Sequence, residues 1–203
     1  MIKPLAKSAS IRPSGLILAG GQSRRFSGNT KALLLIDGET MISLVARHLA
    51  AESRIAELII SSNTEHAEYS RLADAVISDQ IGDHWGPLAG LHSGLTKAAS
   101  DWMIVAACDQ PLLPPWYVSS MVAACNGRDI VLAVDDQRQH FLNLLLPTRL
   151  QKSLHGHLVS GGRRVQQWIE QVGYTEAKFA VGLLDSVNRP EELERIRAGS
   201  VSD

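Results

Sequence analysis

Short apolar runs rich in isoleucine, valine and leucine alternate along this chain with segments of helical period. The first run covers residues 15–19, and later ones are "ELIISS", "DAVIS" and "DWMIVAACD". Near-continuous apolar runs are typical of buried strands, and parallel strands need a crossover segment, usually a helix, between them. The alternation therefore predicts an α/β fold with helices laid on a mostly parallel sheet.

Two segments between these runs, "MISLVARHLAA" and "GPLAGLHSGLTKAA", have the apolar spacing of helices. Their expected buried faces carry Ile42, Val45, Leu49, Leu88, Leu91 and Leu95. Only a short polar turn separates "DIVLAVDD" from "HFLNLLLP", which predicts an antiparallel pair and hence a mixed sheet. The C-terminal third predicts the helix "RLQKSLHGHL", a glycine break, the helix "RRVQQWIEQVG", a strand near "EAKFAV" and a last helix begun by Pro190.

Length, charge and cysteine content limit the class of protein. The 203 residues fit a single domain, which we assign to residues 14–199 after a flexible leader over residues 1–13. A net charge of -1 argues against a broad surface for nucleic acid or anionic membrane. No apolar run reaches signal-peptide or membrane-spanning length, so we expect a cytoplasmic protein. Cys108 and Cys125 form no CxxC pair and are expected to be buried thiols.

The loop after the first strand, in "LILAGGQSRRFSGNTKALL" from Leu16, has the composition of an anion site. Ligands of α/β sheets gather at the carboxyl ends of strands, where helix N-termini meet phosphates. Gly20 and Gly21 allow close backbone approach and unusual torsions, while Arg25 and Lys31 add positive charge. Lys31 at a helix start opposes the helix dipole unless an anion also binds there. The loop therefore predicts a triphosphate site.

Alternatives to this interpretation are a P-loop, a dinucleotide-binding turn and a solvated turn without a ligand. The chain lacks both Gly-Lys-Ser/Thr and G-x-G-x-x-G, which disfavours the first two. A glycine-rich turn with solvated arginines remains the simplest structural alternative.

Two aspartates are expected at the same edge of the sheet. Asp109 ends an apolar strand in "ACDQPLLPP" and is placed to hold Mg²⁺, although capping the following turn is its alternative role. Asp79 stands where the preceding strand stops and can accept hydrogen bonds from a base or ribose. In the loop after it, His84 and Trp85 are candidates to cover the site.

Arg163 and Arg164 form a second basic group, in "SGGRRVQQW" at a predicted helix start. Phosphate on a second substrate would resolve the conflict of these charges with the helix dipole. A salt bridge to a neighbouring strand accounts for them equally well.

Taken in order, "LILAGGQSRRFSGNTKALL", "GPLAGL", "ACDQPLLPP", "GGRRVQQWI" and "VNRPEEL" resemble the molybdenum cofactor guanylyltransferase family. The similarity extends from Gly15 to Arg197. It implies a single Rossmann-like three-layer α/β/α domain of the nucleotide-diphospho-sugar transferase type. The implied reaction transfers GMP from GTP to the terminal phosphate of molybdopterin, with Mg²⁺ as cofactor and pyrophosphate as the second product.

The resemblance also implies roles for individual residues. Catalysis is expected from Lys31, Arg25 and Asp109, with Asp109 as the metal ligand. The nucleotide is expected to contact Leu18, Ala19, Gly20, Gly21, Arg25, Lys31, Ser61, Asp79 and Asp109. The acceptor is expected to contact Arg163, Arg164 and Asn188.

Other functions stay open at this point. Thr30, Phe141 and Ser186 differ from the pattern of the family, as do Ser27 and Ser61. The alternatives are a cytidylyltransferase that uses CTP, another nucleotidyltransferase of the same fold, and a non-catalytic nucleotide- or pterin-binding partner. The acceptor can arrive free or on a molybdenum insertion or carrier protein.

Overall fold

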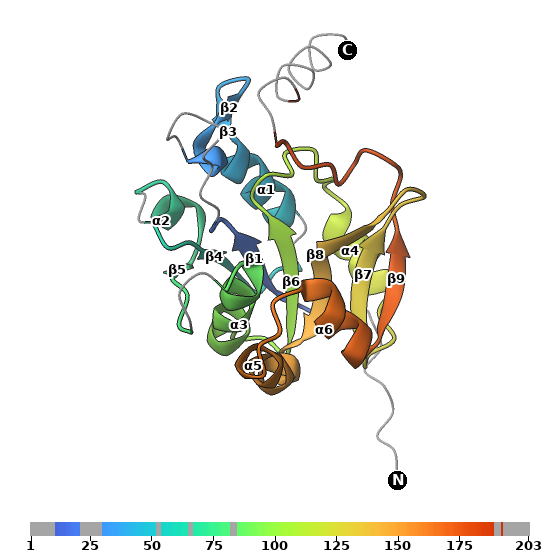
Figure 1. Ribbon diagram of the computed structural model, residues 1–203. Coiled ribbons are helices and arrows are strands. Elements are labelled where there is room, and N and C mark those ends of the chain that lie inside the picture. The colour runs from blue at the N-terminus through green and yellow to red at the C-terminus, as the bar shows by residue number, and fades with distance from the viewer. Residues whose placement is uncertain are drawn as a thin grey trace.

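The computed structural model describes residues 11–20, 30–51, 54–64, 67–81, 85–188 and 192 (Figure 1). Within these residues, seven strands form one sheet in the order β5-β4-β1-β6-β8-β7-β9. The strands are β1 (Ser14–Leu18), β4 (Glu57–Ser61), β5 (Ala75–Ile77), β6 (Trp102–Ala107), β7 (Ile130–Val134), β8 (Gln139–Pro147) and β9 (Tyr174–Lys178). Of these, β8 alone runs antiparallel to its neighbours. The predicted mostly parallel, mixed sheet is confirmed.

Helices cover both faces of the sheet (Figure 1). Alternate strand residues such as Ile17 and Ile104 pack with α1 (Met41–Ala50) and α4 (Tyr117–Ala123). Their neighbours, such as Leu16 and Val105, pack on the other face with α3 (Pro87–Lys97), α5 (Gln151–Val159) and α6 (Val165–Val172). A period of two sends successive side chains to opposite faces, so one strand supplies both core layers. In the described part of the chain, no helix is both long and apolar enough to cross a membrane.

The predicted helix faces agree with the observed burial. Each of the six apolar positions expected on α1 and α3 is at most 4% exposed. The antiparallel pair of β7 and β8 and the two helices α5 and α6 are also confirmed. A 3-10 turn, η3 (Thr148–Leu150), precedes α5.

Three expectations need correction. The first strand begins and ends one residue earlier than predicted, at Ser14 and Leu18. The strand in "DAVIS" is an edge strand with one hydrogen-bonded neighbour among the described strands, so Val76 is 36% exposed rather than buried. Cys125 is half-buried, whereas Cys108 is buried as expected.

Some elements were not predicted. A short hairpin of β2 (Leu35–Ile36) and β3 (Glu39–Thr40) turns through Asp37 and Gly38, both with positive φ. Asp-Gly between apolar residues is a recognised signal for such a turn. The short helix α2 (Tyr69–Leu72) also had no predicted counterpart.

The two ends of the assigned domain are described only in part. Residues 11–13, assigned to the leader, contact the domain: Ile11 is 6% exposed, and the Pro13 carbonyl accepts a hydrogen bond from the Ala56 N–H at 2.9 Å. Residues 1–10 lie outside the described residues, as does Pro190 with its predicted helix start.

The packing of α3 on β1 predicts opposite effects of alanine at two helical glycines. A Cβ at Gly94 would lie 2.6 Å from Leu16 Cδ2 in the core, whereas Gly156 in α5 is exposed with open space beside it. Gly94→Ala should lower the free energy of unfolding by about 1–2 kcal/mol, because overpacking outweighs the gain in helix propensity. Gly156→Ala should raise it by about 0.5–1 kcal/mol. Urea denaturation measures both, and a neutral Gly94→Ala would contradict the close packing.

Candidate functional site

Hydrogen bonds beyond the strand ends hold three chain segments together at one edge of the sheet. The Ala19 N–H donates to the Ser61 carbonyl at 2.8 Å, and the Cys108 N–H donates to the Leu18 carbonyl at 3.1 Å. The segments that leave β1, β4 and β6 are therefore adjacent. This places Gly20 and Asp109 at the same carboxyl edge, as the parallel order of the strands requires.

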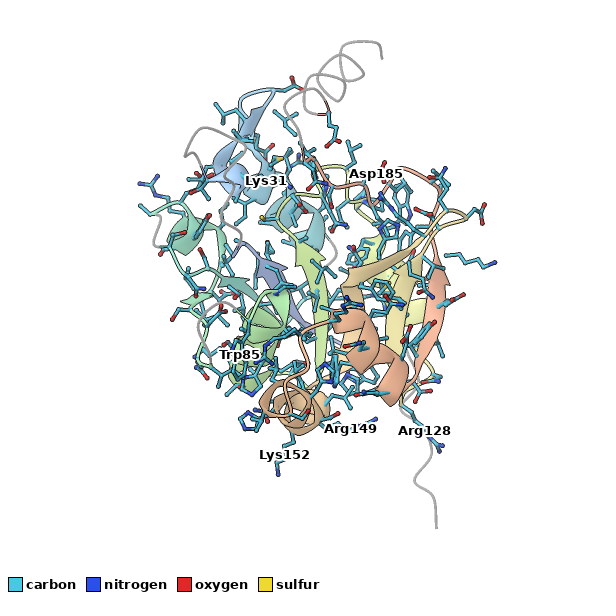
Figure 2. The ribbon with its side chains drawn as sticks, viewed as in Figure 1. Lys31, Trp85, Arg128, Arg149, Lys152 and Asp185 are labelled. Carbon is cyan, nitrogen blue, oxygen red and sulfur yellow. The ribbon has the colours of Figure 1, made fainter. Side chains whose placement is uncertain are left out.

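An ion pair joins two of these segments. Lys31 Nζ lies 2.5 Å from Asp109 Oδ2, and the two side chains are only 15% and 20% exposed. The same ammonium donates to Asn188 Oδ1 at 3.0 Å. The Val187 N–H donates to the Asp109 carbonyl at 2.8 Å, so the C-terminal segment is attached to the same point. Figure 2 shows Lys31 at this end of the molecule, with Asp185 of the same C-terminal segment farther along the same side. Three predicted site residues are thus brought into direct contact.

The environment of Lys31 differs from the one expected. Lys31 opens a single 3-10 turn, η2 (Lys31–Leu33), with extended backbone on either side at Thr30 and Leu34. A turn of three residues aligns too few peptide dipoles for the predicted conflict with a helix dipole. The Asp109 carboxylate, rather than a dipole, determines the electrostatics of this lysine.

One oxygen of Asp109 lies in the ion pair, and the other has no partner among the described residues. Its Oδ1 is buried and accepts no hydrogen bond from the described residues. A buried, unsatisfied carboxylate oxygen is rare and fits a cation ligand. Those residues contain no group of three or more His, Cys, Asp or Glu side chains that could hold a metal. This donor set suits Mg²⁺, which often binds one or two carboxylates and takes its other ligands from water and phosphates.

The neighbouring thiol of Cys108 is not a ligand of this kind. Burial raises the pKa of Cys108 to about 12, and the nearby Asp109 charge adds to the increase. The thiol therefore stays protonated at neutral pH, whereas metal ligation and nucleophilic attack need the thiolate.

Asp79 is fixed by a side chain that the sequence did not single out as its partner. Asn63 Nδ2 donates to Asp79 Oδ2 at 2.8 Å, and the Asp79 N–H donates to Asn63 Oδ1 at 2.9 Å. These reciprocal bonds hold Asp79 beyond the end of β5. Its carboxylate retains acceptor capacity for another donor.

Ser61 and Gly20 occupy different parts of the edge. Ser61 is 3% exposed and lies beneath α3, where a Cβ on Gly90 would come within 2.6 Å of Ser61 Oγ. Gly20 is exposed, has open space beside it, and does not adopt the unusual torsion expected of it. Gly21 and Arg25 lie outside the described residues.

A buried amide pair supports the turn that carries Asp109. Gln110 Nε2 donates to Asn143 Oδ1 and to the Leu184 carbonyl, both at 2.8 Å, while Gln110 Oε1 accepts from Asn143 Nδ2 at 3.0 Å. Gln110 and Asn143 are 3% and 1% exposed. Sequence reasoning missed both, although Asn143 is the polar interruption in the apolar run "HFLNLLLP".

The two arginines before α6 have different surroundings. Arg163 Nη1 donates to the Leu158 and Gly162 carbonyls at 2.8 and 2.6 Å, and its guanidinium carbon lies 4.1 Å from the Trp85 ring centroid. These contacts replace the salt bridge considered as its structural role. Arg164 is exposed, and within the described residues its side chain forms no hydrogen bond or ion pair.

Comparison with known proteins identifies the family. Residues 15–176 match the MobA-like NTP transferase domain. The chain belongs to the MobA-like NTP transferase family. Over 193 residues this MobA-like chain is 31% identical to the molybdenum cofactor guanylyltransferase of Shewanella sp. (strain MR-4), covering 93% of this chain and 97% of the relative. The sequence resemblance is thereby confirmed, and the protein is a nucleotidyltransferase.

Solved structures agree on the fold. Molybdopterin-guanine dinucleotide biosynthesis protein A from Archaeoglobus fulgidus superimposes with a TM-score of 0.69 at 20% identity, covering 94% of this chain and all (100%) of the other. 4-Diphosphocytidyl-2C-methyl-D-erythritol synthase from Anaerococcus prevotii superimposes with a TM-score of 0.73 at 11% identity, covering 95% and 97% of the two chains. These likenesses confirm the predicted nucleotide-diphospho-sugar transferase-like architecture of this MobA-like chain.

The buried amide pair yields a test of how the Asp109 turn is supported. Gln110→Leu should lower the free energy of unfolding by about 2–4 kcal/mol, because it leaves several buried polar groups unpaired. Adding Asn143→Leu should recover part of that loss, since the second amide then no longer lacks its partner. Chemical denaturation of the two single variants and of the double variant measures this coupling, and strictly additive losses would contradict it.

Proposed function

We propose that this MobA-like protein transfers GMP from GTP to the terminal phosphate of molybdopterin and releases pyrophosphate, acting in the cytoplasm. The observation that carries the proposal is the contact of Lys31 with Asp109 and Asn188 at the carboxyl edge of the sheet. The names of its relatives supply the two substrates. The contact supplies a cation for phosphate and a carboxylate for a divalent metal at the point where two substrates can meet.

The proposed reaction makes modest demands on acid–base catalysis. An oxygen of the acceptor phosphate forms a bond to the α-phosphorus of GTP, and the bond from that phosphorus to the bridging β-oxygen breaks. The second pKa of a phosphate monoester is about 6, so the attacking oxygen is already largely ionised at neutral pH. Catalysis then rests on alignment of two anions and neutralisation of their charge.

Lys31 and Asp109 supply these charges in the proposal. Before substrate binds, they neutralise each other across 2.5 Å. A triphosphate that enters the edge offers Lys31 an alternative anion and leaves Asp109 available to a divalent cation, which we take to be Mg²⁺. When bound, Mg²⁺ would neutralise charge on the phosphates. Asp109 Oδ1, which has no hydrogen-bond partner in the part of the chain that the structure describes, supports this role.

The other proposed contacts at this sheet edge divide among the phosphates, the nucleoside and the acceptor. The backbone from Leu18 to Gly21 would face the phosphates with Arg25, while Ser61 and Asp79 would lie on the nucleoside side. Asn188, which contacts Lys31, would face the acceptor together with Arg164, while Arg163 would support Arg164 from the preceding turn. In this arrangement Asn188 is placed between the nucleotide and the second substrate.

The proposal is tested by supplying molybdopterin with Mg²⁺ and each of GTP, CTP, ATP and UTP, and by measuring pyrophosphate and the dinucleotide product. Formation of the guanine dinucleotide alone is expected. A preference for CTP would make the protein a cytidylyltransferase. Nucleotide binding without product would indicate a non-catalytic partner.

Removing the Lys31 charge should slow GMP transfer. Lys31→Met keeps the apolar stem but removes the ammonium, so kcat for GMP transfer should fall about 10²–10³-fold, as for loss of other groups that stabilise transition-state charge. Lys97→Met, at an exposed position in the last turn of α3, is the matched control and should retain the wild-type rate. Equal rates for the two variants would contradict a role of Lys31 in the transfer reaction.

A further inference from the structure

We propose that Trp85 is a positioning residue for the acceptor: its indole ring holds the Arg163 guanidinium and thereby fixes the start of α6, where Arg164 is presented to an anionic group of the second substrate. This inference rests on the proposed GMP transfer, because that reaction supplies the anionic acceptor. In Figure 2 Lys31 lies in the upper part of the view and Trp85 in the lower part, so Trp85 is not beside the Lys31–Asp109 pair.

The contacts of Arg163 make it part of the framework. Two carbonyls, those of Leu158 at the end of α5 and Gly162 in the following turn, accept hydrogen bonds from its Nη1. The Trp85 ring centroid lies 4.1 Å from its guanidinium carbon, within the range of a cation–π contact. These contacts make the Arg163 guanidinium a structural part of the turn between α5 and α6.

Trp85 is itself anchored at the start of α3, the helix that packs on the ends of β1 and β4. Its half-buried ring packs against the hydrophobic cluster beneath α3, and the next residue, Gly86, is the N-cap of α3 with φ of 66°. Four residues further, Gly90 packs against Ser61 and Leu18, with a built Cβ only 2.6 Å from Ser61 Oγ and 3.0 Å from Leu18 Cδ2. The start of α3 is therefore tightly seated on the ends of β1 and β4.

The Trp85–Arg163 contact consequently joins two regions with different proposed partners. On one side lie α3 and the strand ends near the nucleotide loop. On the other side lies Arg164, the N-cap of α6, which has extended backbone (φ -101°, ψ 123°) and an exposed side chain. The Arg164 side chain has no hydrogen bond or ion pair with the described residues, so its charge is available to an acceptor anion. The orientation of Arg164 depends on the backbone that Arg163 holds.

The test compares steady-state GMP transfer by Trp85→Leu and Trp85→Phe in the full-length protein. Trp85→Leu removes the aromatic face and should raise KM for molybdopterin about tenfold, comparable with the strength of a partly desolvated cation–π contact, while kcat and KM for GTP stay within about twofold. Trp85→Phe keeps an aromatic face and should recover most of the loss. Thermal unfolding of each variant reports separately on folding.

A double-mutant cycle with Arg163→Ala separates positioning from general damage. Arg163→Ala should reproduce the effect of Trp85→Leu on the acceptor KM, and the double variant should be no worse than either single one. Arg164→Gln should raise the same KM by itself. Added to Trp85→Leu or to Arg163→Ala, it should raise that KM no further, because the Arg164 charge is already misplaced in those variants.

The outcomes distinguish the inference from the function beneath it. A wild-type protein that makes no guanine dinucleotide rejects the proposed function, and this inference with it. If the wild type makes the guanine dinucleotide, an unchanged acceptor KM in Trp85→Leu rejects the positioning role alone. Equal increases in the KM values for GTP and for the acceptor in that variant reject it as well. Multiplicative losses in the Trp85/Arg163 cycle would also overturn it.

Discussion

The ion pair of Lys31 and Asp109 is the contact on which the rest of the site depends. Its members are 78 residues apart in sequence and mostly buried, so each charge stabilises the other where water is scarce. Removing one partner from such a pair leaves an uncompensated charge and is costly. A phosphate and a metal cation that arrive together can replace both partners at once. In the proposed reaction the pair is costly to break one partner at a time, yet it can be exchanged for a charged substrate and its metal together.

Hydrogen bonds around the pair hold the Asp109 backbone in place. The Gln110–Asn143 amide pair fixes the turn after β6 from below, and the Val187 N–H bonds the Asp109 carbonyl from the C-terminal segment. These partners belong to the turn after β6, to β8 and to the segment after β9, which the fold brings together. Their bonds to buried groups limit how far the Asp109 backbone can move when its side chain changes partner.

Much of this arrangement could be predicted from the sequence because it follows from periodicity. The apolar runs and helical faces determine a parallel sheet, and a parallel sheet brings Gly20, Asp79 and Asp109 to its carboxyl edge. Side-chain partners follow from tertiary packing and could not be predicted in the same way. Lys31 was placed at a helix start, yet its backbone forms one 3-10 turn and its charge pairs with Asp109. The sequence predicts that Trp85 lies over the site, but the contact of its ring with Arg163 has no signal in the sequence.

The central claim is that Asp109 binds the metal that accompanies the nucleotide once Lys31 has turned to the phosphates. Calorimetric titration of GTP with and without Mg²⁺, on the wild type and on Asp109→Asn, tests it most directly. The wild type should bind GTP more tightly with Mg²⁺, and Asp109→Asn should lose that enhancement while still binding GTP. An Asp109→Asn variant with the same Mg²⁺ enhancement as the wild type would contradict the account and place the metal elsewhere.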